Sequence, residues 1–305
     1  MRAVASAAPG VAVRAGGGGR PERGSPGTAT GLRQRVLTGL VLLPVTVAAI
    51  LWLPTPAFAV TVAAVILAGG WEWSRLSGWT AGPARALYTL ALAGALAVAT
   101  LLLPWAPGQL ALLGLGLLWW LAAAGVVVRF ERAGSPLAWP RGLRALAGGL
   151  VLVPAWGALV GLHAREVSGP AWVLFLAVTI WVADSGAFFV GRRWGRRRLA
   201  PRVSPGKSWE GVAGGMLVAV LAAALTATLA GVSSDRLPGL LLLVLATVAA
   251  SVLGDLTESL FKRAAGVKDS GSLLPGHGGV LDRIDSLTAA APLFGLGLHW
   301  VGGLP

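Results

Sequence analysis

Long apolar segments separated by short polar loops constrain this 305-residue chain more than any other feature. Of its residues, 55% are apolar and only 12% are charged, whereas soluble domains carry roughly a quarter charged residues. A soluble fold of this size could not bury so much apolar surface, so lipid must act as part of the solvent. The sequence therefore predicts an all-α, polytopic membrane protein.

Nine segments have the length and composition of a membrane-spanning helix, which needs about 20 mostly apolar residues. They are 36–53, 57–71, 86–104, 109–128, 145–163, 171–190, 212–231, 237–255 and 287–303. The second segment is short and Pro154 interrupts the fifth, so eight to ten spans are compatible with the sequence. The alternating pattern of a membrane β-barrel is missing from the sequence, so helices are the expected spanning structure.

The distribution of basic residues predicts how these spans are oriented. With nine spans and a cytoplasmic N-terminus, 23 of the 25 Lys and Arg residues fall on the cytoplasmic side, and only Arg165 and Arg236 fall outside. Loops rich in Lys and Arg are retained in the cytoplasm. We therefore expect a multi-pass protein of the inner (cell) membrane whose two most polar loops, 191–211 and 256–286, face the cytoplasm.

The chain also divides into a tail and a membrane-embedded part. Residues 1–30 are rich in Gly, Ala, Arg and Pro and cannot build a core, so we expect a disordered cytoplasmic tail. Residues 31–305 then form one membrane domain, with its polar motifs within 180–290. The net charge of +13 is not carried by a soluble module with interleaved aromatic residues, which argues against nucleic-acid binding. Cysteine is absent from the sequence, which excludes disulfides and thiolate metal sites.

Asp184 is the first candidate functional residue, because it stands inside an apolar run, Trp181–Gly186. A carboxylate at such a position costs several kcal/mol unless it has a partner or a water-filled cavity. The alternative is a structural ion pair with an arginine such as Arg192.

A second group of polar residues lies at the end of the eighth predicted span. Its members are spaced i, i+3, i+4 and i+7 and so share one helix face: Asp255, Glu258, Ser259 and Lys262. The alternative is a solvated helix face that leaves the membrane, with an ordinary pair between Glu258 and Lys262.

The third group is the segment from Lys268-Asp269 to Ser286, which contains Gly276-His277-Gly278 and Asp282-Arg283. Glycines around a histidine allow backbone amides to approach phosphate oxygens. Asp282 and Asp285 lie one helical turn apart where the ninth span begins. Carboxylates among basic residues at the membrane boundary suit Mg²⁺, which uses one or two carboxylates together with substrate phosphate. A glycine-rich turn between charged helix ends is the alternative.

The loop before the seventh predicted span is the last candidate. Its arginine run, Arg192–Arg198, is typical of a cytoplasmic, lipid-facing patch. Gly206-Lys207-Ser208 imitates the end of a Walker A loop, but Pro201 stands where that motif requires glycine. Ser204 and Lys207 therefore remain candidate phosphate contacts of a different kind of loop.

These motifs resemble the phosphatidate cytidylyltransferase family. The resemblance is carried by one run of residues with the family's spacing, which are Ser259, Lys262-Arg263, Lys268-Asp269, Pro275, His277-Gly278-Gly279, Asp282-Arg283 and Asp285. Upstream, Asp184, Gly191-Arg192 and the segment Ser204–Gly211 also resemble it, although Gly206 replaces a common lysine and Ser208 a common threonine.

The resemblance implies a polytopic helical fold, commonly a homodimer, with a polar cavity open to the cytoplasm and to lipid. The implied substrates are CTP and phosphatidic acid, which react through attack of a lipid phosphate oxygen on the α-phosphorus of CTP. Asp255 and Asp282 are expected to bind Mg²⁺, with Asp184, Asp269 or Asp285 supporting a second cation or ordering the first. The expected catalytic set is Asp255, Asp282, Lys207 and Asp285. The expected substrate-binding set is Ser204, Lys262, Arg263, Lys268, Gly276, His277, Gly278 and Arg283.

Two rival functions remain at this point. A CTP-dependent lipid kinase is also polytopic, but it releases CDP instead of pyrophosphate. A transporter would use Asp184 and Asp255 as ion ligands, but its sites lie near the membrane midplane between repeated halves. The acidic residues here gather at one predicted membrane face instead.

Overall fold

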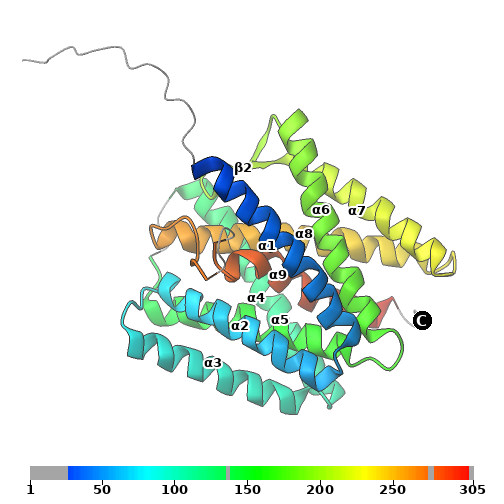
Figure 1. The fold of residues 1–305 in the computed structure, drawn as a ribbon, viewed down its shortest axis with the longest axis horizontal. Coiled ribbons are helices and arrows are strands. Elements are labelled where there is room, and N and C mark those ends of the chain that lie inside the picture. The colour runs from blue at the N-terminus through cyan, green and yellow to red at the C-terminus, as the bar shows by residue number, and fades with distance from the viewer. Residues whose placement is uncertain (1–26, 135–137, 274–277, 302–305) are drawn as a thin grey trace, which may run out of the picture.

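The computed structural model describes residues 27–134, 138–273 and 278–301, which form nine helices and one β-hairpin (Figure 1). The predicted tail lies outside the described residues up to position 26. In chain order the helices are α1 (Gly27–Trp52), α2 (Thr55–Leu76), α3 (Gly82–Leu102), α4 (Ala106–Ala133), α5 (Arg141–His163), α6 (Gly169–Trp194), α7 (Trp209–Leu229), α8 (Leu237–Ala264) and α9 (Leu281–Trp300). The hairpin, β1 (Arg198–Ala200) and β2 (Ser204–Ser208), connects α6 to α7.

Each of the nine predicted spans corresponds to one of these helices, so the prediction of an all-α polytopic membrane protein is confirmed. Seven helices, α2 to α8, are long and apolar enough to cross a membrane within the described ranges. The part of α1 from Thr38 onward is a shorter apolar helix, and α9 begins with the charged residues Asp282, Arg283 and Asp285. The count of nine spans and the side on which the N-terminus lies therefore stay predictions.

Helix α5 forms the centre of the bundle and packs against α2, α4 and α9. Figure 1 shows α2 and α3 along one side of the molecule and α6 with α7 along another, with α8 and α9 labelled between them. Small residues allow neighbouring helices of the bundle, such as α6 and α7, to pack closely. On α7, for example, a Cβ atom at Gly214 would lie 2.5 Å from Val190, and one at Gly215 would lie 2.5 Å from the Ala183 carbonyl oxygen of α6.

The contact between α8 and α9 positions the candidate site. At Gly254 an added Cβ atom would collide with the carbonyl oxygen of Asp285 and would lie 3.1 Å from the Ala289 side chain. The two helix backbones therefore approach closely only because residue 254 is glycine. This approach places the polar end of α8 beside the charged first turn of α9.

Polar segments that are distant in sequence meet at one end of the bundle. The Glu131 carboxylate at the end of α4 accepts hydrogen bonds from the hairpin amides of Arg202 and Val203. The α6–α7 hairpin also contacts α8, and the end of α2 contacts the start of α9. The loops predicted to be cytoplasmic thus share one end of the molecule, as their predicted alternation across the membrane requires.

Candidate active site

The hairpin holds Lys207 against α8. The Lys207 Nζ atom lies 2.6 Å from Asp255 Oδ2, and the Ser259 hydroxyl donates to Asp255 Oδ1 at 3.2 Å. The strand position of Lys207 is fixed because the next residue, Ser208, caps α7 by accepting a hydrogen bond from the Gly211 amide. Both oxygens of Asp255 therefore have a partner, and both partially exposed side chains of the ion pair remain within reach of solvent.

A second lysine–aspartate pair joins α8 to α9. Lys262 Nζ lies 2.7 Å from Asp282 Oδ1 and 3.5 Å from Glu258 Oε2. The pair between Glu258 and Lys262 that the sequence offered as an alternative thus exists, but Lys262 makes its shorter contact to Asp282 on the neighbouring helix. The two side chains are only 11% and 8% exposed, and charge–charge attraction is stronger there than at an exposed surface.

Asp282 is the most extensively bonded carboxylate of the site. Its Oδ2 atom accepts hydrogen bonds from the Ser270 amide (3.1 Å), the Ser270 hydroxyl (3.0 Å) and the Gly279 amide (2.9 Å). Asp282 precedes the predicted apolar span of α9. Burial acts to raise its pKa, but the hydrogen bonds from Lys262 and Gly279 outweigh it and hold the pKa of Asp282 below its usual value. The side chain is therefore an anion at neutral pH.

Two further aspartates lie close enough to share this electrostatic field. Asp184 on α6 interacts electrostatically with Lys207 and Asp255. Asp285 on α9 interacts in the same way with Asp255 and Lys262. Asp184, Asp255, Asp282 and Asp285 therefore belong to one cluster, whose positive members are Lys207 and Lys262.

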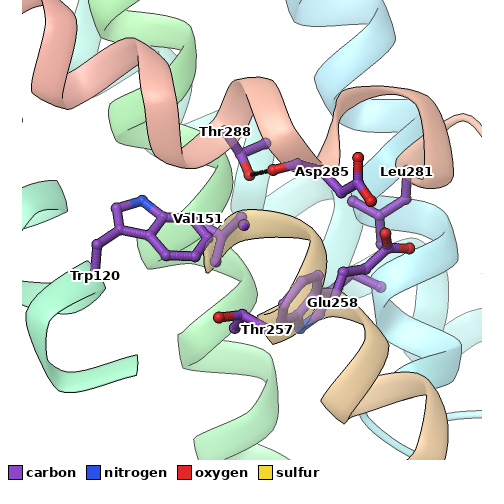
Figure 2. Close-up of a pocket in the computed structure, with 9 residues that line it drawn as sticks. Trp120, Val151, Thr257, Glu258, Leu281, Asp285 and Thr288 are labelled. Carbon is purple, nitrogen blue, oxygen red and sulfur yellow. Dashed lines mark hydrogen bonds between the residues drawn. The ribbon is translucent and has the colours of Figure 1, made fainter. Parts of the chain in front are cut away.

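A small cavity lies directly beneath this cluster (Figure 2). Figure 2 shows the side chains of Glu258 and Asp285 extending toward one another at one side of the cavity, with Trp120 at the other. Glu258 is only 2% exposed, and neither of its carboxylate oxygens has a hydrogen-bond partner with good geometry. Thr257 Oγ1 and Trp120 Nε1 line the same cavity without a partner. Buried polar groups without a partner are costly. The cavity beside the cluster is therefore lined by hydrogen-bonding atoms that have no partner within the described part of the chain.

The other predicted site residues differ in exposure, and two of them lie outside the described ranges. Arg263, Lys268, Asp269 and Arg283 are exposed, and Ser204 is half-buried in β2. Gly278 adopts the left-handed backbone conformation (φ +82°), which glycine tolerates best. Gly276 and His277 lie outside the described residues. The roles assigned to all these residues stay predictions.

Sequence reasoning missed Glu72, a buried carboxylate near the end of α2. Glu72 is 2% exposed and accepts hydrogen bonds from the Val280 amide (3.1 Å), the Leu281 amide (2.8 Å) and the Ser270 hydroxyl (3.0 Å). A signal was present, since Glu72 is a lone acidic residue between Trp71 and Trp73 at the end of an apolar segment. The second predicted span, 57–71, ends one residue before it.

The chemistry of the site suits a hard divalent cation. The described ranges contain no ready-made group of three or more acidic or histidine side chains arranged around a metal position. Mg²⁺ does not need one, because it commonly binds one or two carboxylates and takes its other ligands from substrate phosphate and water. Asp255 and Asp282 supply two such carboxylates, each now neutralised by a lysine. They fit a cation that arrives with a polyphosphate.

Comparison with known proteins shows the family to which the chain belongs. The family model described as "Cytidylyltransferase family" matches residues 33–301. A phosphatidate cytidylyltransferase of Pseudomonas aeruginosa is 46% identical over 274 residues, covering 89% of this chain and 98% of the relative. A phosphatidate cytidylyltransferase of Haemophilus influenzae is 39% identical over 287 residues (86% and 97%), and one of Brucella suis is 36% identical over 262 residues (86% and 91%). Family model and relatives span nearly all of the membrane domain, and this chain therefore belongs to the cytidylyltransferase family.

Proposed function

We propose that this protein transfers the cytidylyl group of CTP to phosphatidic acid, which yields CDP-diacylglycerol and pyrophosphate for phospholipid biosynthesis. One observation supports this most directly. Two lysine–aspartate pairs, Lys207 with Asp255 and Lys262 with Asp282, meet at one end of a membrane-embedded bundle. A soluble nucleotide and the headgroup of a membrane lipid are both able to reach such a place.

The main barrier to this reaction is repulsion between two anionic substrates. A phosphate oxygen of phosphatidic acid attacks the α-phosphorus of CTP, the bond to the β-phosphate breaks, and pyrophosphate leaves. The attacking oxygen is already anionic, so the chain need not supply a general base. Mg²⁺, when bound, would neutralise phosphate charge and stabilise the leaving pyrophosphate.

The chain's own residues have two tasks in this scheme. Asp255 and Asp282 would hold the cation, with Asp184 or Asp285 balancing its charge. Lys207 and Lys262, released from their aspartates as the cation binds, would turn to phosphate oxygens and hold the substrates together. Arg263 directly follows Lys262 and Arg283 directly follows Asp282. These two exposed side chains, together with exposed Lys268, would attract the anionic substrates.

An apolar groove beside the site fits the lipid substrate. It has a volume of about 290 Å³ and lies between α4, α8 and α9, with Trp120 shared between the groove and the cavity beneath the cluster. Five alanines widen it, namely Ala124, Ala246, Ala249, Ala250 and Ala289. On α8 the lining runs from Leu253 back to Ala246, which takes it about 14 Å below Asp255 at 1.5 Å per residue. We propose that one acyl chain lies here while its headgroup reaches the cluster.

The proposed setting is the inner membrane, with the site facing the cytoplasm where CTP is made, and with two copies of the chain forming a homodimer. The excess of basic residues in the loops that share the end of the bundle with the site supports this orientation.

The decisive experiment supplies the purified protein in detergent with α-labelled CTP and phosphatidic acid. We expect labelled CDP-diacylglycerol and an equal amount of pyrophosphate. The release of CDP with phosphorylation of a lipid alcohol such as dolichol would instead indicate a CTP-dependent kinase. If neither product formed with Mg²⁺ present, the proposed function would be wrong.

A further inference from the structure

We propose that Glu72 is a positioning residue that holds Asp282 and the first turn of α9 in the geometry needed to bind a phosphate-bound divalent cation. This inference rests on the function proposed above for the cluster, but it concerns a residue outside that cluster. Glu72 lies on α2, about 200 residues away in sequence from the three groups that donate hydrogen bonds to it.

The burial of Glu72 is the first argument. Removing a carboxylate from water costs several kcal/mol unless hydrogen bonds compensate for the loss. Glu72 is 2% exposed, and its compensation comes from the backbone amides of Val280 and Leu281 and from the Ser270 hydroxyl. The Glu72 side chain therefore ties the end of α2 to the segment that carries Asp282.

The start of α9 is the second argument. The first amides of a helix have no partner within that helix and favour a negative charge. Glu72 accepts from two of these amides, while Asp282 accepts from the Gly279 amide just before them. The two carboxylates thus bind three consecutive backbone amides, of Gly279, Val280 and Leu281, at the start of α9. Moving Glu72 would move Asp282.

Ser270 links the two carboxylates directly. Its hydroxyl lies 3.0 Å from Glu72 Oε2 and 3.0 Å from Asp282 Oδ2, and the residue is 1% exposed. A hydroxyl has one proton to donate, so it bonds fully to only one carboxylate at a time. When a cation takes Asp282, Glu72 remains as the acceptor for that proton, and Ser270 is not left unsatisfied.

Two glycines show how closely the backbone surrounds Glu72. A Cβ atom at Gly271 would collide with the Glu72 carboxylate, and one at Gly279 would lie 2.5 Å from Glu72 Oε2. Only glycine at both positions allows the backbone at residues 271 and 279 to lie against the carboxylate. Gly271 and Gly279 therefore make room for the buried Glu72 carboxylate, in addition to any contact that this loop makes with phosphate.

The test compares Glu72→Gln with Trp156→Phe. The glutamine keeps the size of the side chain but replaces one acceptor oxygen with an NH₂ donor that must face an N–H or O–H group. Trp156→Phe removes a different buried hydrogen bond to α2, from Trp156 Nε1 to the Ala59 carbonyl (3.0 Å), away from the site. It is the control for loss of stability alone.

The readouts are binding of the Mn²⁺–CTP complex to the detergent-solubilised protein, followed by electron paramagnetic resonance without lipid substrate, and the Mg²⁺ concentration that gives half-maximal turnover. Loss of a residue that supports a metal ligand typically weakens metal binding or activity by about 10–100-fold. We expect such a weakening for Glu72→Gln, and unchanged values with a lowered melting temperature for Trp156→Phe.

Ser270→Ala completes the test and guards against a Glu72 variant that fails to fold. It removes the link to Asp282 while leaving Glu72 its two amide donors, so we expect a weakening of Mn²⁺–CTP binding that is not additive with Glu72→Gln. Unchanged Mn²⁺–CTP binding in both variants, or an absence of Mn²⁺–CTP binding in the parent protein, would overturn the inference. A parent that bound Mn²⁺–CTP but released no pyrophosphate would refute the proposed function and leave the role of Glu72 supported.

Discussion

Replacing Asp282 with asparagine tests the site at its most connected residue. The carboxylate accepts from Lys262 Nζ through Oδ1 and from three donors of Ser270 and Gly279 through Oδ2. An asparagine keeps one oxygen, and its NH₂ group must face one of these two sets. Facing Lys262 costs less, because the amide oxygen then keeps the three neutral donors.

The size of the effect follows from what Lys262 loses. A hydrogen bond to a charged group contributes about 1.5–3 kcal/mol. Lys262 keeps Glu258 at 3.5 Å as a second partner, so we expect a loss of about 2 kcal/mol in the free energy of unfolding. The effect on turnover should be larger, at least about 100-fold or roughly 2.7 kcal/mol in the activation free energy, because the negative charge that would hold the cation is removed.

The assay measures transfer of label from α-labelled CTP to lipid, with the melting temperature measured on the same detergent preparation. Asp235→Asn is the matched control, since Asp235 is an exposed acid in the α7–α8 loop away from the contacts of the cluster. It should retain parental activity. If Asp282→Asn were also as active as the parent, Asp282 would have no role in holding a cation, and the reasoning would be refuted.

Four further predictions follow from the same geometry. Lys207→Met should lower kcat/KM for CTP by about 10–100-fold through loss of a charged phosphate contact, and unchanged kinetics would remove Lys207 from the substrate site. Excess EDTA should abolish pyrophosphate release and added Mg²⁺ should restore it, whereas undiminished turnover in chelator would exclude a divalent cation. Ala124→Phe should fill the groove and raise KM for long-chain phosphatidic acid but not for CTP, while Ala122→Phe, exposed on the same helix outside the groove, should change neither. An engineered cysteine at exposed Pro201 should resist labelling from outside intact cells and one at exposed Ser234 should react, and the opposite pattern would invert the topology.

The sequence predicted the helices well because a bilayer imposes a simple rule. A spanning segment must satisfy its backbone internally and present apolar side chains over about 20 residues, and both requirements are local. Proline inside a predicted span did not break this rule. Pro154, for instance, is accommodated within α5 and does not end it.

The candidate site was only partly predictable. Asp255, Glu258 and Lys262 could be placed on one helix face by spacing alone, and the structure places them there. Spacing could not reveal that Lys207 pairs with Asp255, or that Lys262 prefers Asp282 to its neighbour Glu258. Those choices depend on the distance between helices, which is set by packing at residues such as Gly254.

The sequence by itself therefore determined the membrane environment, the order of the helices and the identity of the charged groups, because each depends on residues that are neighbours along the chain. Only the tertiary structure decided which charges meet. It joined Glu72 to Ser270 and Leu281 across about 200 residues and made a buried acid of α2 part of the support for Asp282. The physical reason is that burying a charge is costly unless a partner is at hand, and the identity of that partner is fixed by how the helices pack.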